Sequence, residues 1–404
     1  MKIGFFSDTY KPQKNGVATA LYFQKKTLEE EGHEVHLFIP YIPKILPEKN
    51  VYQLSSITFP FQKEHRIATP FSIKYDLYLN NLKLDVIHTH TPFSLGIFGA
   101  YEAKKRKIPL IHTYHTLLTE YAYYIWDHFP EMVKKCMITE KRAKDIAIWI
   151  SRFYCNLCDT VIAPSTKIKK LLINFGVKKP IEIIPNGLDL RNFHPIDKKV
   201  AREKLNLPID AYILLFVGRL GKEKNIEFLL KVMNKLKNYP KIYILIVGDN
   251  PDKRVKNNLK EEAKKLNIED RVIFTGYLDY HKVIEAYYSS DIFVFSSLTE
   301  TQGLVVLEAL TAGLPVIALE DEAIADFVKD EINGFLIPFK TSNIEESIIL
   351  FSNKVIELLE NHNLYKKLSE NAINSAQNFS VQKINKRLLD LYNNLVKEYN
   401  IKNA

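Results

Sequence analysis

Short runs of apolar residues recur along the chain, and each run ends in a small or polar residue that precedes a stretch of helix-forming composition. In the first half these runs are Ile3–Ser7, Val35–Pro40, Asp85–His90, Leu110–His115 and Thr160–Ser165. In the second half they are Tyr212–Gly218, Ile242–Gly248, Arg271–Gly276, Ile292–Ser297 and Pro315–Leu319. Their length and β-branched content predict buried strands, and the alternation with helices predicts parallel sheets with right-handed crossovers.

Two groups of these units are separated near Pro185–Gly187, which predicts two doubly wound α/β domains. Turn-forming residues and Pro195 indicate a linker over 186–211. The last segment, Val381–Tyr399, has apolar residues at helical spacing and predicts an amphipathic helix instead of another strand–helix unit.

Composition favours a soluble globular protein, since 46% of the 404 residues are hydrophobic and 25% are charged. The chain shows neither an apolar run of about 18 residues, as a membrane span needs, nor the pattern of a signal peptide at its start. Its cysteines, Cys136, Cys155 and Cys158, are too few for a disulfide framework and form a poor zinc set, so we expect reduced thiols.

The positive charge is concentrated in the first half of the chain. Residues 1–180 hold 26 Lys and Arg against 16 Asp and Glu, whereas the whole chain has a net charge of +9. The basic residues gather at Lys104, Lys105, Arg106, Lys107, Lys134, Lys135, Lys141, Arg142, Lys144 and Arg152. This asymmetry indicates an anionic partner, either nucleic acid or an acidic membrane surface, and the alternative is a solvated lysine-rich surface. Glycine-flanked aromatic motifs and a reading helix are missing from the sequence, which disfavours nucleic acid.

Ligands of open parallel sheets bind beyond the carboxyl ends of the strands, so the residues after each run are candidates for function. After the first run, a loop over 7–17 ends with Gly16 before a helix, where backbone amides can meet a phosphate. The chain lacks a G-x-G-x-x-G at this loop, which disfavours a dinucleotide-dependent dehydrogenase.

The first strand of the second half is followed by the segment Gly218–Asn225, which contains Arg219 and Lys224. Two cations at the end of one strand suit a diphosphate whose negative charge grows as it leaves. The alternative is that both residues are ordinary surface charges.

The strongest candidate segment contains Glu300 and Glu308, with Gly303 opening a helix between them. The amides of Gly303 and Leu304 would face a phosphate at the helix N-terminus. Glu300 precedes the helix and can reach a sugar, whereas Glu308, among apolar neighbours, can hold ribose hydroxyls.

His112 and His115 follow a strand of the first half, and His115 can hydrogen-bond a sugar hydroxyl. Together with His88 and His90 they leave a metal site open as an alternative, but carboxylates at matching spacing are missing. An Asp-x-Asp, the usual handle for a metal–diphosphate complex, is also missing from the sequence.

Six segments together resemble glycosyltransferase family 4: SDTYKPQKNGVATAL, HTYHT, IPNGLD, GRLGKEKN, FTGYL and ETQGLVVLEALTAGLPVIA. The resemblance spans nearly the whole chain. It implies a retaining enzyme of the glycosyltransferase-B fold, in which two Rossmann-like α/β domains face each other across a cleft. The implied boundaries are 1–187 for an acceptor-binding domain and 188–380 for a nucleotide-sugar-binding domain, with a terminal helix over 381–404 that packs back on the first domain.

The resemblance also implies roles for single residues. Arg219 and Lys224 would bind the donor diphosphate after Gly218, with the amides of Gly303, Leu304 and Val305 on its phosphate and Gly16 closing the site. Glu308 would bind ribose, Tyr277 would border the base, Glu300 would contact the sugar, and His115 would contact its 6-hydroxyl. The leaving phosphate would take the acceptor's proton, and the enzyme would need neither a metal nor a permanently bound cofactor.

Within the family, the opening segment and HTYHTLLTEY look most similar to members that glycosylate diacylglycerol. The aromatic run Tyr121–Trp126 and the basic residues after it suit contact with an anionic membrane. We therefore expect UDP-glucose as donor, diacylglycerol as acceptor and a cytoplasmic enzyme attached to the inner face of the membrane. Galactose as the sugar, or a soluble acceptor such as a glycan or a small molecule, remains the alternative.

Overall fold

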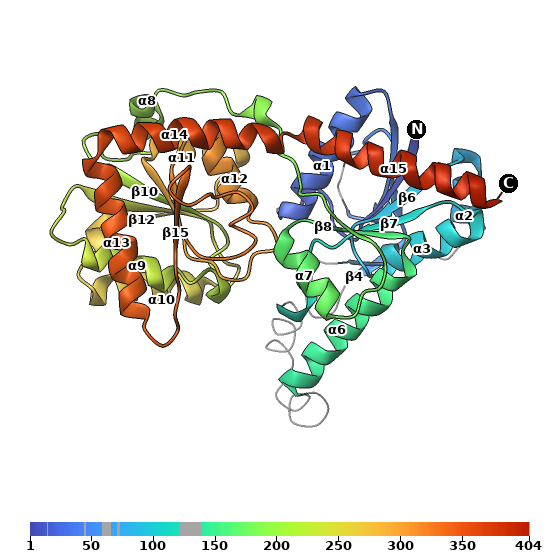
Figure 1. The fold of residues 1–404 in the computed structure, drawn as a ribbon, viewed down its shortest axis with the longest axis horizontal. Coiled ribbons are helices and arrows are strands. Elements are labelled where there is room, and N and C mark those ends of the chain that lie inside the picture. Colours follow the sequence, from blue (N-terminus) through green and yellow to red (C-terminus); the bar gives the residue numbers. More distant parts are fainter. Residues whose placement is uncertain (14, 44–45, 59–65, 71–72, 121–138, 404) are drawn as a thin grey trace. The chain divides into compact units, whose positions relative to one another are not determined.

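The fold comes from a computed structural model that describes residues 1–404 except 14, 44–45, 59–65, 71–72, 121–138 and 404 (Figure 1). The aromatic run Tyr121–Trp126 and the residues Lys134, Lys135 and Cys136 lie outside the described residues. Contacts divide the chain into two compact units. Unit 1 comprises Met1–Gly187 together with Val381–Ala404, and unit 2 comprises Leu188–Ser380.

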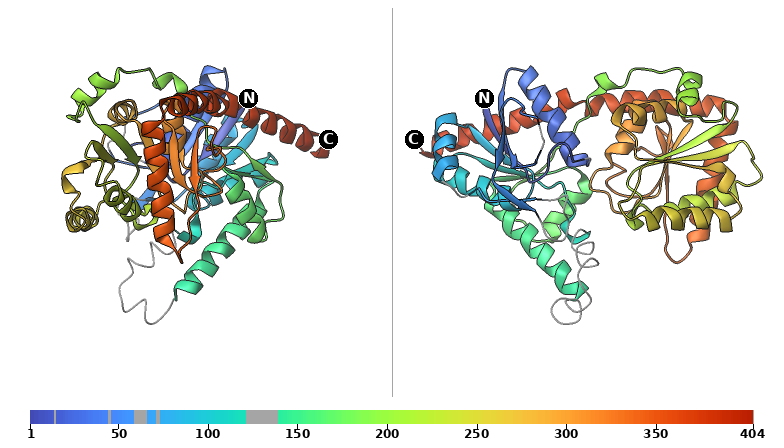
Figure 2. Two further views of the ribbon diagram at one scale, coloured as in Figure 1. Left: turned by 60° about the vertical axis from the view of Figure 1, so that its left-hand side comes forward. Right: turned by 180° about the vertical axis from the view of Figure 1, so that it is seen from behind.

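Unit 1 is built on a parallel sheet of seven strands in the order β3-β2-β1-β6-β7-β8-β9. The strands are β1 (Lys2–Phe6), β2 (Glu34–Pro40), β3 (Val51–Leu54), β6 (Val86–Thr89), β7 (Leu110–Thr113), β8 (Thr160–Ala163) and β9 (Ile181–Ile183). Helices flank the sheet on both faces (Figures 1 and 2): α1 (Gly16–Glu30), α2 (Ile73–Leu82), α3 (Ser94–Arg106), α6 (Glu140–Leu157), α7 (Thr166–Asn174) and α15 (Val381–Asn403). A small antiparallel pair, β4 (Ser56–Thr58) and β5 (Arg66–Ala68), lies apart from this sheet.

The two faces of this sheet carry separate cores because side chains alternate along each strand. Phe5 belongs to the core under α1 and α15, whereas its neighbour Phe6 belongs to the core under α2, α3, α6 and α7. The last helix completes the first core with Ile384, Leu388 and Tyr392. The C-terminal segment is therefore part of unit 1, although more than 190 residues separate it along the chain from Gly187.

Unit 2 has a parallel sheet of six strands in the order β12-β11-β10-β13-β14-β15. They are β10 (Tyr212–Val217), β11 (Ile242–Val247), β12 (Val272–Gly276), β13 (Ile292–Phe295), β14 (Val316–Leu319) and β15 (Gly334–Ile337). The helices are α8 (Lys198–Lys204), α9 (Ile226–Lys235), α10 (Lys253–Lys265), α11 (Tyr280–Ser289), α12 (Leu304–Thr311), α13 (Ile344–Glu360) and α14 (His362–Ala376). The structure thus contains the predicted strands of both halves, and it adds β3, β9 and β15 at the sheet edges.

The segment predicted as a linker, 186–211, is partly helical and belongs to unit 2 almost entirely. It contains a 3-10 turn over Leu190–Asn192 and the helix α8. Arg202 of α8 is buried, and it donates to the Ser289 carbonyl at 2.9 Å and to Asp291 Oδ2 at 2.7 Å. Because these contacts hold the segment against unit 2, the interpretation as a free linker was wrong.

Cys155, on the inner side of α6, and Cys158, just after the end of this helix, are buried free thiols. Burial raises the pKa of both thiols, so they stay protonated at neutral pH. Among the described residues, none of the helices is long and apolar enough to cross a membrane.

Candidate functional site

The strand order of unit 2 reverses between β10 and β13, and the loops that follow these two strands meet at this switch point. Lys224 comes from the loop after β10 and Glu300 from the loop after β13. Lys224 Nζ donates to Glu300 Oε1 at 2.5 Å, and the two side chains are 20% and 11% exposed. The structure therefore joins two of the predicted site residues directly.

The loop after β10 folds so that its backbone stays close to the sheet. Lys222–Lys224 form a 3-10 turn, and Asn225 closes it in the left-handed region with φ 52°. Ser296 donates from Oγ to the Lys224 carbonyl at 2.7 Å, which fixes the loop against the end of β13. Arg219 is half-exposed and donates to Glu223 Oε1 at 2.6 Å. Arg219 and Lys224 are thus each paired with a carboxylate.

The helix α12 begins with an N-terminus suited to an anion. Gly303 precedes it with φ +79° and, as the N-cap residue, supplies no side-chain hydrogen bond to its first turn. The amides of Leu304 and Val305 lie in that first turn, where the helix itself offers no acceptor. The dihedral angle favours glycine, and a Cβ at Gly303 would lie 2.6 Å from Ile324 Cδ1, so the end of the Ile324 side chain would have to move.

Glu308 is buried on α12, one turn after these amides. Burial raises the pKa of its carboxyl to about 7, and the hydrogen bond from Tyr287, which donates to Oε2 at 2.7 Å, opposes this rise. Tyr287 also donates to the Val305 carbonyl at 3.2 Å. A carboxylate held in this way can accept hydrogen bonds from neighbouring hydroxyls of a ligand.

Tyr277 follows β12, next to a close approach of two backbones. Gly276 has φ +71°, and its carbonyl accepts from the amide of Gly248 at the end of β11. A Cβ at Gly248 would lie 1.9 Å from the carbonyl oxygen of Gly218. The ends of β10, β11 and β12 are therefore brought together by glycines, and the exposed ring of Tyr277 lies beside them.

Unit 1 has its own switch point between β1 and β6, where the sequence analysis missed Asp8. Asp8 accepts from Thr91 Oγ1 at 2.6 Å, from Ser94 Oγ and from the Leu95 amide at 3.2 Å. It thereby caps α3, whose own N-cap residue supplies no side-chain hydrogen bond. Burial raises the pKa of this carboxyl. Its position just after the first strand was the signal that could have identified it.

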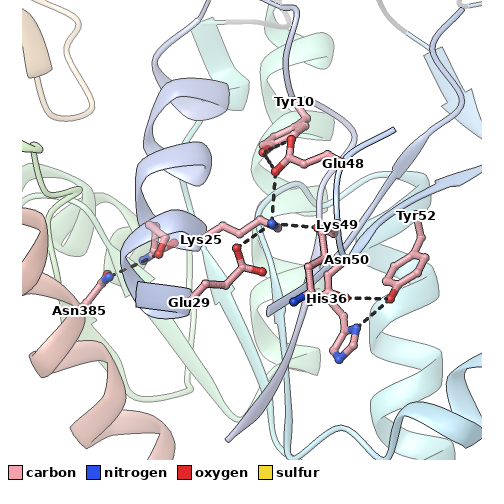
Figure 3. Close-up of polar contacts among 10 residues, drawn as sticks. Tyr10, Lys25, Glu29, His36, Glu48, Lys49, Asn50, Tyr52 and Asn385 are labelled. Carbon is pink, nitrogen blue, oxygen red and sulfur yellow. Dashed lines mark hydrogen bonds and ion pairs between the residues drawn. The ribbon is translucent and has the colours of Figure 1, made fainter. Parts of the chain in front are cut away.

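Gly16 is the first residue of α1, and Asn15 caps this helix by accepting from the Ala18 amide at 2.9 Å. A partly buried network of hydrogen bonds and ion pairs holds the loop before it (Figure 3). Tyr10 donates from its hydroxyl to Glu48 Oε1 at 3.1 Å, and the buried Lys25 donates to the same oxygen at 3.2 Å. Lys25 also donates to Glu29 at 2.9 Å, so α1 and the loops after β1 and β2 are tied together.

His115 lies beside His90, and the distance between His115 Nε2 and His90 Nδ1 is 3.0 Å. Burial lowers the pKa of His115 to about 3, so its imidazole is neutral. His88 contacts Thr113 Oγ1 at 2.7 Å and the Tyr392 hydroxyl at 2.5 Å, and His112 contacts the Thr89 carbonyl at 3.0 Å. Within the described ranges, no three His, Cys, Asp or Glu side chains are grouped so as to hold a metal ion.

Comparison with known proteins identifies both halves of the chain. Residues 197–375 match the family model described as Glycosyl transferases group 1, and residues 14–192 match Glycosyltransferase Family 4. The chain is 35% identical over 344 residues to the alpha-monoglucosyldiacylglycerol synthase of Streptococcus pneumoniae, which covers 83% of this chain and 75% of the relative. It is 31% identical over 416 residues to the enzyme of the same name from Acholeplasma laidlawii, which covers 100% and 99%.

A similar fold is found in Anabaena Alr3699/HepE, solved in complex with UDP-glucose. The TM-score is 0.74 at 20% identity, and the match covers 98% of this chain and 100% of that chain.

Proposed function

The chain belongs to glycosyltransferase family 4, with two Rossmann-like domains of the glycosyltransferase-B fold, and from this premise we propose that it transfers glucose from UDP-glucose to diacylglycerol with retention of the anomeric configuration. The observation that carries the proposal is the arrangement at the β10–β13 switch point of unit 2. There Lys224, Glu300 and the N-terminus of α12 converge.

Each part of the donor has one proposed partner in unit 2. The diphosphate binds the amides of Leu304 and Val305, with Arg219 and Lys224 supplying positive charge. The ribose binds Glu308, whose buried carboxylate accepts from its hydroxyls, and the base lies along Tyr277. The sugar contacts Glu300, which the ion pair with Lys224 holds in place. The same donor chemistry is supported by the UDP-glucose bound to Anabaena Alr3699/HepE.

Two residues of unit 1 have proposed roles of their own. Gly16 offers its backbone amide to a phosphate at the start of α1, and His115 donates to or accepts from the 6-hydroxyl of a sugar. Because its pKa is low, His115 acts as a neutral hydrogen-bonding group and not as a cation.

The proposed step needs no side-chain nucleophile. The bond between the anomeric carbon and the diphosphate oxygen breaks, and the acceptor hydroxyl forms its bond to the same face of the sugar. The proton of that hydroxyl passes to the leaving phosphate. Lys224 and Arg219 stabilise the negative charge that grows on the diphosphate, which is the task that a metal ion performs in other transferases.

The lipid acceptor is supported by the two relatives named alpha-monoglucosyldiacylglycerol synthase. Unit 1 also contains a hollow of about 790 Å³ between β2, β3 and α2, with a largely apolar lining that suits an acyl chain. The residues that line it are Phe38, Val51, Tyr52, Gln53, Leu54, Tyr75, Leu77, Tyr78 and Asn81. With the excess of positive charge in residues 1–180, this supports action at an anionic membrane surface, which we place at the inner face of the cell membrane.

Incubation with radiolabelled nucleotide sugars tests the reaction. We expect label from UDP-glucose in a lipid product when diacylglycerol is supplied in vesicles, with an α anomeric signal by NMR. Incorporation from UDP-galactose instead would change the donor sugar. Label that appears only in a soluble glycan or small-molecule acceptor would refute the lipid acceptor.

Replacement of Lys224 by Ala tests the donor site. The variant loses the cation nearest Glu300 at the switch point, and we expect turnover to fall by about two to three orders of magnitude. Lys222→Ala is the matched control, because Lys222 lies exposed in the same 3-10 turn and should keep near-normal turnover. Near-normal turnover of Lys224→Ala would exclude this donor site.

A further inference from the structure

The helix α6 is apolar on two separate faces. Its inner face packs into the core of unit 1 through Ala147, Tyr154 and Cys155. Its outer face has a second stripe of large apolar side chains, each about half exposed: Ile146 (47%), Trp149 (54%), Phe153 (52%) and Leu157 (49%). Spacings of three and four residues place these four side chains on one side of the helix. The core of unit 1 therefore explains only one of the two faces.

The outer stripe is a connected surface and not a set of scattered residues. The rings of Trp149 and Phe153 are stacked, with centroids 5.3 Å apart and planes at 12°. In Figure 1 the green helix α6 runs downward from the other described elements of unit 1, below the labels α7 and β4. Contiguous exposed apolar surface of this kind marks a binding site for a protein or a membrane.

Two basic residues border this stripe, since Arg142 lies four residues before Ile146 and Arg152 three residues after Trp149. Lys141, Arg142, Lys144 and Arg152 are exposed on α6, and Asp145 is the acidic residue among its described side chains. Asn156 of α6 accepts from the Lys178 amide at 2.8 Å, which places the exposed Lys178 near the end of the helix. By contrast, Lys105 and Arg106 at the end of α3 form ion pairs with Asp76. Part of the positive charge predicted for an anionic partner is therefore presented at α6, whereas Lys104 and Lys107 are exposed elsewhere on unit 1.

We propose that the outer face of α6 docks on an anionic phospholipid bilayer, with the helix lying in the plane of the interface. The apolar stripe enters the boundary between headgroups and acyl chains, and the flanking Lys and Arg contact the acidic headgroups. This inference deepens the proposed function, on which it rests, by naming the surface that brings the enzyme to its acceptor.

The positive charges beside the apolar stripe favour a bilayer over a second copy of the chain as the partner of this face. In a two-fold dimer through this face, Arg142 and Arg152 would lie near the same residues of the partner, and the like charges would repel. An anionic bilayer offers a hydrocarbon interior to the apolar stripe and acidic headgroups to the basic residues.

Vesicle flotation tests the inference, with phosphatidylcholine vesicles that contain or lack phosphatidylglycerol. We expect the unaltered chain to float with the anionic vesicles, and Trp149→Glu and Phe153→Glu each to lower its partitioning about tenfold. Leu350→Glu, on the exposed side of α13 in unit 2, is the matched control and should float normally. The pair Arg142→Glu and Arg152→Glu should abolish the preference for phosphatidylglycerol, whereas Lys260→Glu with Lys264→Glu on α10 should preserve it.

Activity measured apart from vesicles separates this inference from the proposed function. With diacylglycerol in detergent micelles, the α6 variants should transfer sugar as the unaltered chain does. Equal flotation of the variants and the unaltered chain would overturn the role of α6 and leave the proposed function standing. Vesicle binding through α6 without formation of any lipid product would support the role of α6 and refute the proposed transfer to diacylglycerol.

Two further outcomes would also overturn the inference. One is failure of the unaltered chain to bind anionic vesicles, and the other is a dimer that Phe153→Glu dissociates without a change in flotation. If a glutamate variant shows a lowered thermal midpoint, Phe153→Leu and Phe153→Ser replace it as a pair. The leucine variant should keep binding to vesicles and the serine variant should lose it.

Discussion

At the scale of single residues, the pKa of Glu308 controls the proposed contact with ribose. Burial raises this pKa from 4.5 to about 7, so a large fraction of the free enzyme carries a protonated carboxyl at neutral pH. The ionised form accepts hydrogen bonds from two ribose hydroxyls more strongly than the neutral acid does. Ligand binding and proton release at Glu308 are therefore coupled.

We predict that the affinity for UDP-glucose rises as the pH increases through about 7. Calorimetric titration across this range should show the rise in the unaltered chain and a weaker, flat affinity in Glu308→Gln. His115 stays neutral throughout, since its pKa is about 3. The free energy of unfolding of the ligand-free protein depends on pH in the opposite direction. The raised pKa of Glu308 in the folded state stabilises the fold at low pH, and this contribution is lost as the pH rises through about 7. An affinity independent of pH in the unaltered chain would contradict the coupling.

A second residue-scale prediction concerns Gly303. Gly303→Ala should destabilise the protein by about 2–3 kcal/mol, because φ +79° is strained for alanine and the new Cβ meets Ile324. Gly32→Ala is the control: Gly32 has φ +86° with nothing within 4 Å of a Cβ, so only the cost of the dihedral angle, about 1 kcal/mol, should appear. Urea unfolding measures both. Equal costs would mean that the contact with Ile324 relaxes freely.

At the scale of elements, Asp8 shows how a loop from one strand completes a helix that follows another strand. α3 begins at Ser94 without a capping side chain of its own at Phe93. Asp8, more than 80 residues earlier, supplies the missing acceptor. The cap therefore also fixes the loop after β1 relative to the loop after β6, at the switch point of unit 1.

Asp8→Ala should lower the free energy of unfolding by about 2–3 kcal/mol, because it removes a helix cap and leaves the buried Thr91 hydroxyl and the half-buried Ser94 hydroxyl without this acceptor. Asp197→Ala is the control, since Asp197 caps α8 through the Val200 amide at an exposed position, and it should cost about 1 kcal/mol or less. Denaturant unfolding compares them. A smaller cost at Asp8 than at Asp197 would show that water replaces its hydrogen bonds.

At the scale of the whole molecule, the last helix determines which parts of the chain are stable together. α15 covers one face of the unit 1 sheet, where Tyr392 contacts the buried His88 and Asn385 donates to the Gln24 carbonyl at 3.4 Å. Unit 1 therefore needs both ends of the chain, whereas unit 2 is one continuous segment.

Deletion of residues 381–404 should destabilise unit 1 selectively, because it exposes the core formed with Leu388 and Tyr392. Hydrogen exchange measured by mass spectrometry should show faster exchange in β1, β6 and β7, with β10 and β13 unchanged. A shorter deletion that begins after Asn400 keeps this core and serves as the control. Uniform loss of protection in both units would contradict their independence.

The sequence alone predicted the α/β class, two groups of parallel strands, the family, and the loops in which the candidate residues lie. This was possible because buried strands and helices have different apolar periods, and because the carboxyl ends of parallel strands share one edge. The edge strands β3 and β9 escaped prediction because Gln53 and Glu182 interrupt their short apolar runs, and β15 because it spans only Gly334–Ile337.

Only the tertiary structure decided how these parts act on one another. The pairing of Lys224 with Glu300, the cap from Asp8 to α3 and the raised pKa of Glu308 all depend on burial and contact between residues distant along the chain. The same holds for α6, since its sequence contains two apolar stripes and only packing shows which one is buried. The local pattern of apolar and polar residues specifies the helices and strands. The distances between these elements set the electrostatic interactions and the exposure of the side chains, which determine the chemistry proposed for this protein.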